Sequence, residues 1–204
     1  FFSGGIEDNE LEILKAANDN VINQLIVPRP VAGTYNHFYK TISPRTDFGP
    51  YTPEEIEAAI SAGGLFISYI GHSGTATWDN SINETNQLFN DVDRNPLITD
   101  FGCSTNKYAE PDIICFGERF LFNPTGQALA YIGNSSLGFR STATTIPLYF
   151  YESLIADSLS EIGNAHLLSK IKLLNLHGIS GANRVYSLSN VILGDPAVRI
   201  KIPK

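Results

Sequence analysis

The sequence predicts an α/β sandwich in which helices flank a mostly parallel central sheet. Two observations carry this prediction: helical and strand-like patterns alternate along the 204 residues, and the runs at 65–70 and 96–102 are largely apolar on alternate and on neighbouring positions. Continuous apolar runs are typical of strands buried on both faces, as in parallel sheets that are covered by helices. The length suits one well-buried core and is short for two domains.

The first part of the chain predicts one helix and one short strand. Residues 8–25 place apolar side chains at intervals of three or four, the pattern of an amphipathic helix. Asp8 or Asn9 is its predicted N-cap, and the helix must end before Pro28. Residues 36–42 predict a short strand.

A second helix is predicted at 52–64, because Thr52 is a favoured N-cap, Pro53 suits the first helical position and two glycines end the pattern. Strands at 65–70 and 96–102 follow. The remaining predicted elements, in chain order, are a helical segment at 113–122, a strand at 127–133, helices at 147–160 and 163–177, and, within 190–202, a turn at 194–196 and a last strand.

The composition excludes two classes of protein. The chain has 14 basic and 21 acidic residues, a formal net charge of −7, and its basic residues are scattered. A protein that binds nucleic acid through phosphate contacts needs a basic surface. Nowhere does the sequence approach the roughly 20 successive apolar residues that cross a bilayer. The sequence therefore predicts neither a nucleic-acid partner nor a membrane span.

Polar residues follow both central strands at the point where each strand ends. His72 follows the strand at 65–70, and Cys103 directly follows the strand at 96–102. The carboxyl ends of parallel strands share one edge of a sheet, and ligands bind there. If the two strands are neighbours, we expect His72 and Cys103 to lie on the same rim.

One interpretation of this rim makes Ser73 the nucleophile of a serine hydrolase. Residues 71–75, "GHSGT", match four of the five positions of the G-x-S-x-G elbow, with threonine replacing the last glycine. The elbow needs a helix directly after the serine, but the following residues are rich in Thr, Asp and Asn, which are poor helix formers. The downstream histidines, His166 and His177, fall in a predicted helix rather than in a loop.

The second interpretation makes Cys103 the nucleophile and His72 its partner. A thiol reacts as the thiolate, which a neighbouring imidazole stabilises. The glycines at 71, 74 and 102 permit the open backbone that a substrate carbonyl must approach.

The other histidines and the second cysteine carry no partner pattern. His37, His166 and His177 are interpreted as structural or surface residues, and Cys115 as a buried apolar residue. A disulfide between Cys103 and Cys115 is an alternative if the chain is exported.

An ordered series of motifs resembles the gingipain family of cysteine peptidases, which belong to the caspase-like group. The motifs are "YIGHSGTATW", "ITDFGCSTNKY", "FGERFL", "GQALAYIGNSS" and "LGDPAVRI", and the similarity runs from about Phe1 to Ile200. The resemblance implies a caspase-like three-layer sandwich and a single caspase-like peptidase domain over residues 1–204. Gingipain catalytic regions are longer, so it also implies a fragment of a longer parent chain with further N-terminal and C-terminal domains.

The resemblance further implies a cysteine endopeptidase that cleaves polypeptides through a His–Cys dyad. Cys103 would attack the scissile carbonyl, and His72 would protonate the leaving amine. The backbone N–H groups of Ser73 and Cys103 would hold the oxyanion. The loop that runs to Gly138 would line the pocket for the residue before the cut, through Gly133, Asn134, Ser135 and Ser136.

Two positions depart from the family pattern. Ser73 stands where a glycine usually follows the histidine, and Asn106 where a glycine is common three residues after the cysteine. A serine requires a backbone conformation that tolerates a side chain, whereas Asn visits the left-handed region. Asn106 is the milder change. Ser73 and the additional N-terminal subdomain of the gingipains motivate an alternative function, a catalytically impaired caspase-like module that serves as a binding or assembly part of a surface or secretion protein.

Specificity, ions and location complete the expectations. Asp79, Asp91, Asp93 and Asp100 are candidates for a pocket that binds a basic side chain. No cofactor or catalytic metal is required, and calcium is a candidate structural ion over 79–84 and 90–95. By resemblance, the protein is bacterial and secreted or displayed at the cell surface, and a sortase-like transpeptidase is an alternative to plain proteolysis.

Overall fold

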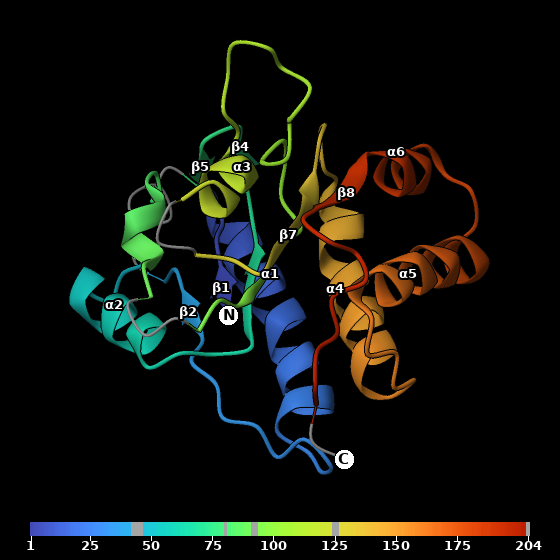
Figure 1. The fold of residues 1–204 in the computed structure, drawn as a ribbon, viewed down its shortest axis with the longest axis horizontal. Helices are drawn as coiled ribbons and strands as arrows, with labels where there is room; N and C mark the ends of the chain where they lie inside the picture. The colour runs from blue at the N-terminus through green and yellow to red at the C-terminus, as the bar shows by residue number, and fades with distance from the viewer. Residues whose placement is uncertain (42–46, 80, 91–93, 124–126, 203–204) are drawn as a thin grey trace.

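The computed structural model describes residues 1–41, 47–79, 81–90, 94–123 and 127–202 (Figure 1). Six strands form one sheet in the order β2-β1-β3-β6-β7-β8, in which β8 is antiparallel to β7 and the other pairs are parallel. The predicted α/β fold with a mostly parallel sheet is therefore confirmed. The strands are β1 (Phe2–Ser3), β2 (Phe38–Tyr39), β3 (Phe66–Ile70), β6 (Leu97–Asp100), β7 (Ala130–Asn134) and β8 (Asn190–Leu193).

Helices cover both faces of the sheet, which makes three layers (Figure 1). One apolar core lies between the sheet and α1 (Asp8–Val21), α4 (Arg140–Ile155), α5 (Ile162–His177) and α6 (Gly181–Ser189). The other lies between the sheet and α2 (Pro53–Ser61) and α3 (Phe116–Leu121). A π-helical turn at Ile22–Ile26 extends α1, and a 3₁₀ turn covers Thr85–Leu88.

Side chains along the central strands alternate between the two cores, as the pleat requires. In β3, Ile67 and Tyr69 face the core with α2 and α3, whereas Ile70 faces the core with α1 and α4. In β6, Leu97 and Ile98 divide in the same way. Both faces carry buried apolar side chains, and this is why the sequence shows largely apolar runs at these strands.

The predicted helix starts are right in one case and shifted in another. At α2 the Thr52 hydroxyl accepts a hydrogen bond from the Glu55 N–H at 3.2 Å, which confirms the predicted cap. The N-cap of α1 is Glu7 rather than Asp8 or Asn9, and its side chain makes no capping hydrogen bond.

The fourth helix begins seven residues before its predicted start. Pro147, the first residue of the prediction, lies inside α4. The preceding turn is rich in Ser and Thr, whose low helix propensity hides the helix from the sequence pattern. The Thr144 and Thr145 hydroxyls donate to the carbonyl oxygens of Arg140 and Ser141, four residues earlier.

Short elements escaped prediction. They are α6 and a hairpin of β4 (Ser73–Gly74) and β5 (Thr77–Trp78), each shorter than the window in which hydrophobic periodicity is clear. The last strand predicted within 190–202 is β8, which precedes the turn at 194–196 and pairs with β7. None of the described helices has the length and apolar character needed to cross a bilayer.

Candidate active site

The register of β3 and β6 brings His72 and Cys103 to one edge of the sheet, just beyond the carboxyl ends of these two strands. The ladder pairs Tyr69 with Asp100, and His72 and Cys103 each lie three positions beyond their strand's member of that pair. The Tyr69 hydroxyl donates to the His72 carbonyl oxygen and so holds the backbone at this point. Both candidate residues line a single cavity of about 60 Å³.

Three parts of the chain enclose this cavity. The first turns of α1 contribute Glu10 and Leu14, and the start of α4 contributes Phe139 and Arg140. The loops after β3 and β6 contribute the histidine, the cysteine and the glycines beside them. The cavity therefore has an apolar lining with charged groups from two helix starts.

The Cys103 thiol lies against the backbone of Gly138. The Gly138 N–H donates to Cys103 Sγ at 3.2 Å, and the sulfur lies 3.7 Å from the Gly138 carbonyl oxygen. An N–H in this position stabilises negative charge on the sulfur. A Cβ at residue 138 would lie 2.9 Å from the Gly102 carbonyl oxygen, so the close approach depends on glycine.

The His72 ring has a carboxylate partner that the sequence patterns missed. His72 Nε2 lies 3.0 Å from both Glu10 Oε1 and Glu10 Oε2. The Glu10 side chain is only 13% exposed and the His72 side chain 46%, so the pair is partly shielded from solvent. In the sequence Glu10 is one of several acidic residues at the start of a helix, and nothing in its pattern distinguishes it.

Ser73 has a structural contact with the cysteine loop. Its hydroxyl donates to the Cys103 carbonyl oxygen at 2.7 Å, and it packs so closely on Gly102 that a Cβ there would clash with it. Ser73 lies in β4 and, among the described residues, is not one of those with positive φ, so its backbone tolerates a side chain. It starts a hairpin rather than a helix, which removes the support for a nucleophile elbow.

The loop after β7 divides into buried and cavity-facing parts. Gly133 and Asn134 are buried, and the Ser135 hydroxyl donates to the Ser189 carbonyl oxygen at 3.0 Å. The Ser136 side chain is exposed, while its carbonyl oxygen accepts from the Ser104 N–H at 2.9 Å. The loop wall that faces the cavity is provided by Gly138 at its end.

A buried chain of hydrogen bonds holds the cysteine loop from below. The Asn134 amide donates to the Gly102 carbonyl oxygen, and the Asn190 amide donates to Asn134 Oδ1 at 2.9 Å. His166 Nε2 lies 2.7 Å from Asn190 Oδ1 and is therefore the donor there. Burial lowers the pKa of His166 to about 4, so its ring is neutral at pH 7. The chain connects α5 to the residue before Cys103.

The carboxylates of Asp79 and Asp100 are buried and already have partners within the protein. Asp79 Oδ2 lies 3.0 Å from Lys40 Nζ, and both side chains are 0% exposed. Asp100 accepts hydrogen bonds from Trp78 Nε1 at 2.7 Å and from the Tyr131 hydroxyl at 2.8 Å, and burial raises its pKa. Neither carboxylate lines the cavity, so neither is available there to a basic side chain of a substrate.

The remaining histidines have local partners. His37 Nδ1 lies 3.0 Å from Asp19 Oδ1, its Nε2 lies 2.8 Å from the Ser3 hydroxyl, and burial lowers its pKa to about 4. His177 Nε2 lies 2.8 Å from the Tyr149 hydroxyl at the end of α5. All of these contacts lie away from Ser73, as does that of His166.

Both cysteines are free, so the disulfide alternative is wrong. Cys115 is fully buried, and burial raises the pKa of its thiol to about 11. Cys103 is only partly buried, which leaves it as the more accessible thiol of the two.

Two of the predicted acidic positions cannot be placed. Asp91 and Asp93 lie outside the described residues, as does part of the segments considered for calcium. Among the residues that are described, no three His, Cys, Asp or Glu side chains come together as a metal site.

Comparisons with known proteins give a family and a fold. The sequence model of "Peptidase family C25" matches residues 1–201. Three solved structures are similar: the Arg-specific cysteine proteinase gingipain R (17% identity, TM-score 0.75), the complex of Porphyromonas gingivalis RgpB pro- and mature domains (17%, 0.74), and a structure titled only "Structure of Protease" (18%, 0.75). No curated protein sequence matches significantly.

The structural matches cover nearly all of this chain and about half of each relative. Each covers 99% of this chain and 47 or 48% of the solved chain. At these identities the likeness establishes the fold, and it confirms the predicted caspase-like sandwich with a mostly parallel sheet.

Proposed function

The chain belongs to peptidase family C25, and from this premise we propose that it is a cysteine endopeptidase domain, or part of one, whose catalytic dyad is His72 and Cys103. The observation that carries the proposal is the shared cavity: both side chains line it, the Gly138 N–H donates to the sulfur and Glu10 binds the imidazole. These are the partners that a thiolate and an imidazolium require.

In the proposed reaction the Cys103 thiolate attacks the carbonyl carbon of the scissile peptide bond, and an electron pair moves onto the carbonyl oxygen. The backbone N–H groups of Ser73 and Cys103 stabilise that oxyanion. When the intermediate collapses, the C–N bond breaks and the His72 imidazolium gives its proton to the leaving amine. Water, deprotonated by His72, then hydrolyses the thioester and releases Cys103.

Glu10 is proposed as the positioning residue for His72. Its two oxygens flank Nε2 at equal distances, so the carboxylate fixes the orientation of the ring. Since the His72 side chain is more exposed than that of Glu10, the contact ties an exposed ring to a shielded carboxylate.

The substrate is proposed to be a polypeptide that lies along the rim beside the loop of residues 133–138. In the same proposal the parent protein carries further domains and is secreted or displayed at a bacterial cell surface. Transpeptidation, in which an amine replaces water at the thioester, uses the same residues and remains a variant of this proposal.

The two alternatives are less well supported. The impaired-module hypothesis was motivated by Ser73, but that residue has a tolerant backbone and a hydrogen bond that joins the two loops of the site. The serine-hydrolase hypothesis lacks both the helix after Ser73 and a histidine partner for it.

No cofactor takes part in the proposed reaction, because the chain itself supplies the nucleophile, the proton donor and the oxyanion donors. Calcium remains proposed only as a structural ion near 79–84 and 90–95. A shift of the thermal unfolding midpoint between calcium and EGTA tests that point.

Hydrolysis of internally quenched peptides tests the proposal. Turnover should be present in the wild-type chain, absent in Cys103→Ala and retained in Cys115→Ala, the matched control at the buried thiol. Turnover that survives Cys103→Ala would refute the dyad.

A further inference from the structure

We propose that Arg140 determines substrate choice by binding a carboxylate of the substrate beside Cys103. The inference rests on the proposed function and adds a substrate class: peptides with an Asp or Glu side chain at the residue that enters the cavity.

The charges of the cavity lining point to this class. Glu10 and His72 satisfy each other at 3.0 Å. Arg140 is exposed, and among the described residues no carboxylate pairs with its guanidinium. Among the described residues that line the cavity, Arg140 is therefore the charged side chain without a charged partner. A guanidinium binds carboxylates in a bidentate geometry.

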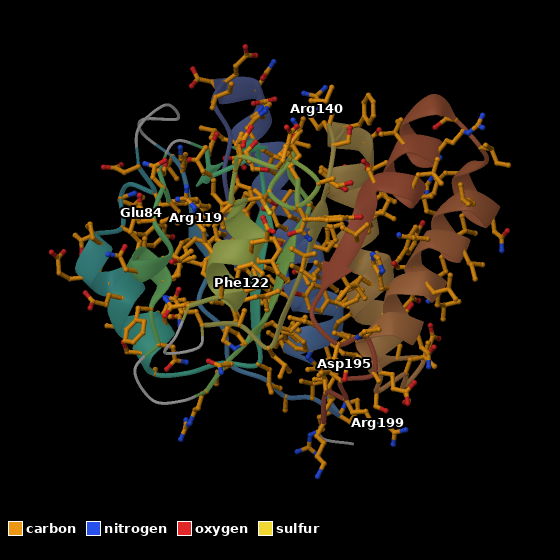
Figure 2. All side chains as sticks on the ribbon, turned by 45° about the horizontal axis from the view of Figure 1, so that its top comes forward. Glu84, Arg119, Phe122, Arg140, Asp195 and Arg199 are labelled. Atoms are coloured by element: carbon orange, nitrogen blue, oxygen red, sulfur yellow. The ribbon has the colours of Figure 1, made fainter. Side chains whose placement is uncertain are left out.

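Arg140 is also close in sequence to the residue that contacts the reacting sulfur. It lies two residues after Gly138, whose N–H donates to Cys103 Sγ at 3.2 Å, so the Cα atoms of residues 138 and 140 are at most about 7 Å apart. Figure 2 shows Arg140 at the N-terminal end of α4, at the opposite end of the view from Asp195 and Arg199. A group bound at the sulfur is thus within reach of the arginine side chain.

The first turn of α4 adds to the positive potential. Its N-cap, Phe139, makes no side-chain capping hydrogen bond, so the first N–H groups of this 16-residue helix have no capping side chain. The helix dipole favours an anion at the same place as the arginine does. A carboxylate next to Arg140 would satisfy both groups.

The size of the cavity and its other charges disfavour a basic side chain. A cavity of about 60 Å³ exceeds the roughly 10–15 Å³ that one water molecule needs and is small for a long side chain, so it suits a short one such as Asp. Leu14, Phe139 and Ala143 offer apolar contacts to its methylene group. A substrate Arg or Lys would meet the like charge of Arg140. Of the carboxylates nearby, Glu10 is engaged by His72, and Asp79 and Asp100 are held in buried contacts outside the lining.

Two small alkylating agents test the proposal without any need for turnover. In both iodoacetate and iodoacetamide, the thiolate sulfur bonds to the CH₂ carbon and displaces iodide. Only iodoacetate carries a carboxylate. The measured quantity is the rate constant of iodoacetate at Cys103 divided by that of iodoacetamide. Each rate is determined by mass spectrometry of the peptide that contains Cys103. N-acetylcysteine gives the reference ratio, and Arg184→Glu, at an exposed arginine on α6, is the matched control.

The ratio at Cys103 in the wild-type chain should exceed the reference by about tenfold, the gain expected from one charge-assisted pair. It should fall to the reference in Arg140→Ala, fall below it in Arg140→Glu, stay high in Arg184→Glu and decrease with added salt. A wild-type ratio equal to the reference, or one unchanged in Arg140→Glu, overturns the proposal whether or not the chain cleaves peptides.

Pairs of peptides in which one member has Asp and the other has Asn at the same position separate this inference from the proposed function. If the wild type prefers the Asp peptide and Arg140→Glu prefers the Asn peptide, the result supports both the peptidase function and the role of Arg140. Cleavage without an acidic preference overturns the role of Arg140 and leaves the dyad intact. If no peptide is cleaved while the alkylation ratio still depends on Arg140, the proposed function fails and the carboxylate site stands.

Discussion

His72 Nε2 lies 3.0 Å from each carboxylate oxygen of Glu10, a residue 62 positions earlier on the first helix. The contact joins α1 to the loop after β3 and fixes the imidazole at the cavity that also holds Cys103. It makes the orientation of the histidine depend on the packing of α1 against the sheet, and several consequences can be measured.

Replacing Glu10 by Gln removes the charge but keeps a hydrogen-bonding side chain. If Glu10 positions His72, kcat should fall about 10²-fold, within the range of general acid–base contributions, while KM changes little. Glu12→Gln, at an exposed residue of the same helix, is the control and should match the wild type. Equal loss of kcat in both variants would argue against a specific role for Glu10.

Replacing Ser73 by Gly tests whether the serine side chain impairs catalysis or is accepted by the backbone at that position. The variant loses the hydrogen bond to the Cys103 carbonyl oxygen, so the free energy of unfolding should fall by about 1 kcal/mol. We expect no gain in kcat/KM, because the backbone at Ser73 already accepts a side chain. A gain of tenfold or more would instead support the impaired-module hypothesis.

Two buried histidines should make the fold sensitive to mild acid. Burial lowers the pKa of His37 and of His166 to about 4, below the usual 6.5. Between these values the unfolded chain binds more protons than the folded one, so stability decreases as the pH falls from about 7 toward 4. Each of these histidines should lower the free energy of unfolding by roughly 2 kcal/mol when the pH falls from 7 to 5.

Urea unfolding at the two pH values measures this loss. His166→Leu should reduce the pH dependence by about half, whereas His177→Leu, at an exposed histidine on the same helix, should leave it unchanged. An identical pH dependence in His166→Leu and the wild type would show that His166 is not neutral in the folded state.

The buried ion pair of Lys40 and Asp79 should be structural rather than substrate-binding. Lys40→Met leaves an uncompensated buried carboxylate and should lower the free energy of unfolding by about 3–5 kcal/mol. Lys107→Met breaks an exposed pair with Glu110 and should cost less than about 1 kcal/mol. Comparable losses in the two variants, measured by urea unfolding, would contradict the assignment.

The elements that the sequence predicted are those with strong local patterns. The runs at 65–70 and 96–102 are apolar on both faces, and the parallel pairing of β3 with β6 then brings His72 and Cys103 together. The sequence pattern misses the first seven residues of α4, because the Ser–Thr segment before Pro147 has little helix propensity.

The parts of the site that escaped prediction depend on distant contacts. Glu10 reaches His72 across 62 positions, and the Gly138 N–H reaches Cys103 Sγ across 35. Neither residue carries a pattern of its own, since a glutamate in a first helical turn and a glycine in a loop are ordinary. Only the packing of α1 and α4 on one face of the sheet selects them.

The rate at which iodoacetamide alkylates Cys103, compared between the wild type and His72→Ala, tests the dyad most directly. The account predicts that Cys103 in the wild type reacts at least tenfold faster than N-acetylcysteine at pH 7 and that His72→Ala loses this advantage. It also predicts that a fluorophosphonate leaves Ser73 unmodified. Equal alkylation rates in the two proteins, or a fluorophosphonate adduct on Ser73, would contradict it.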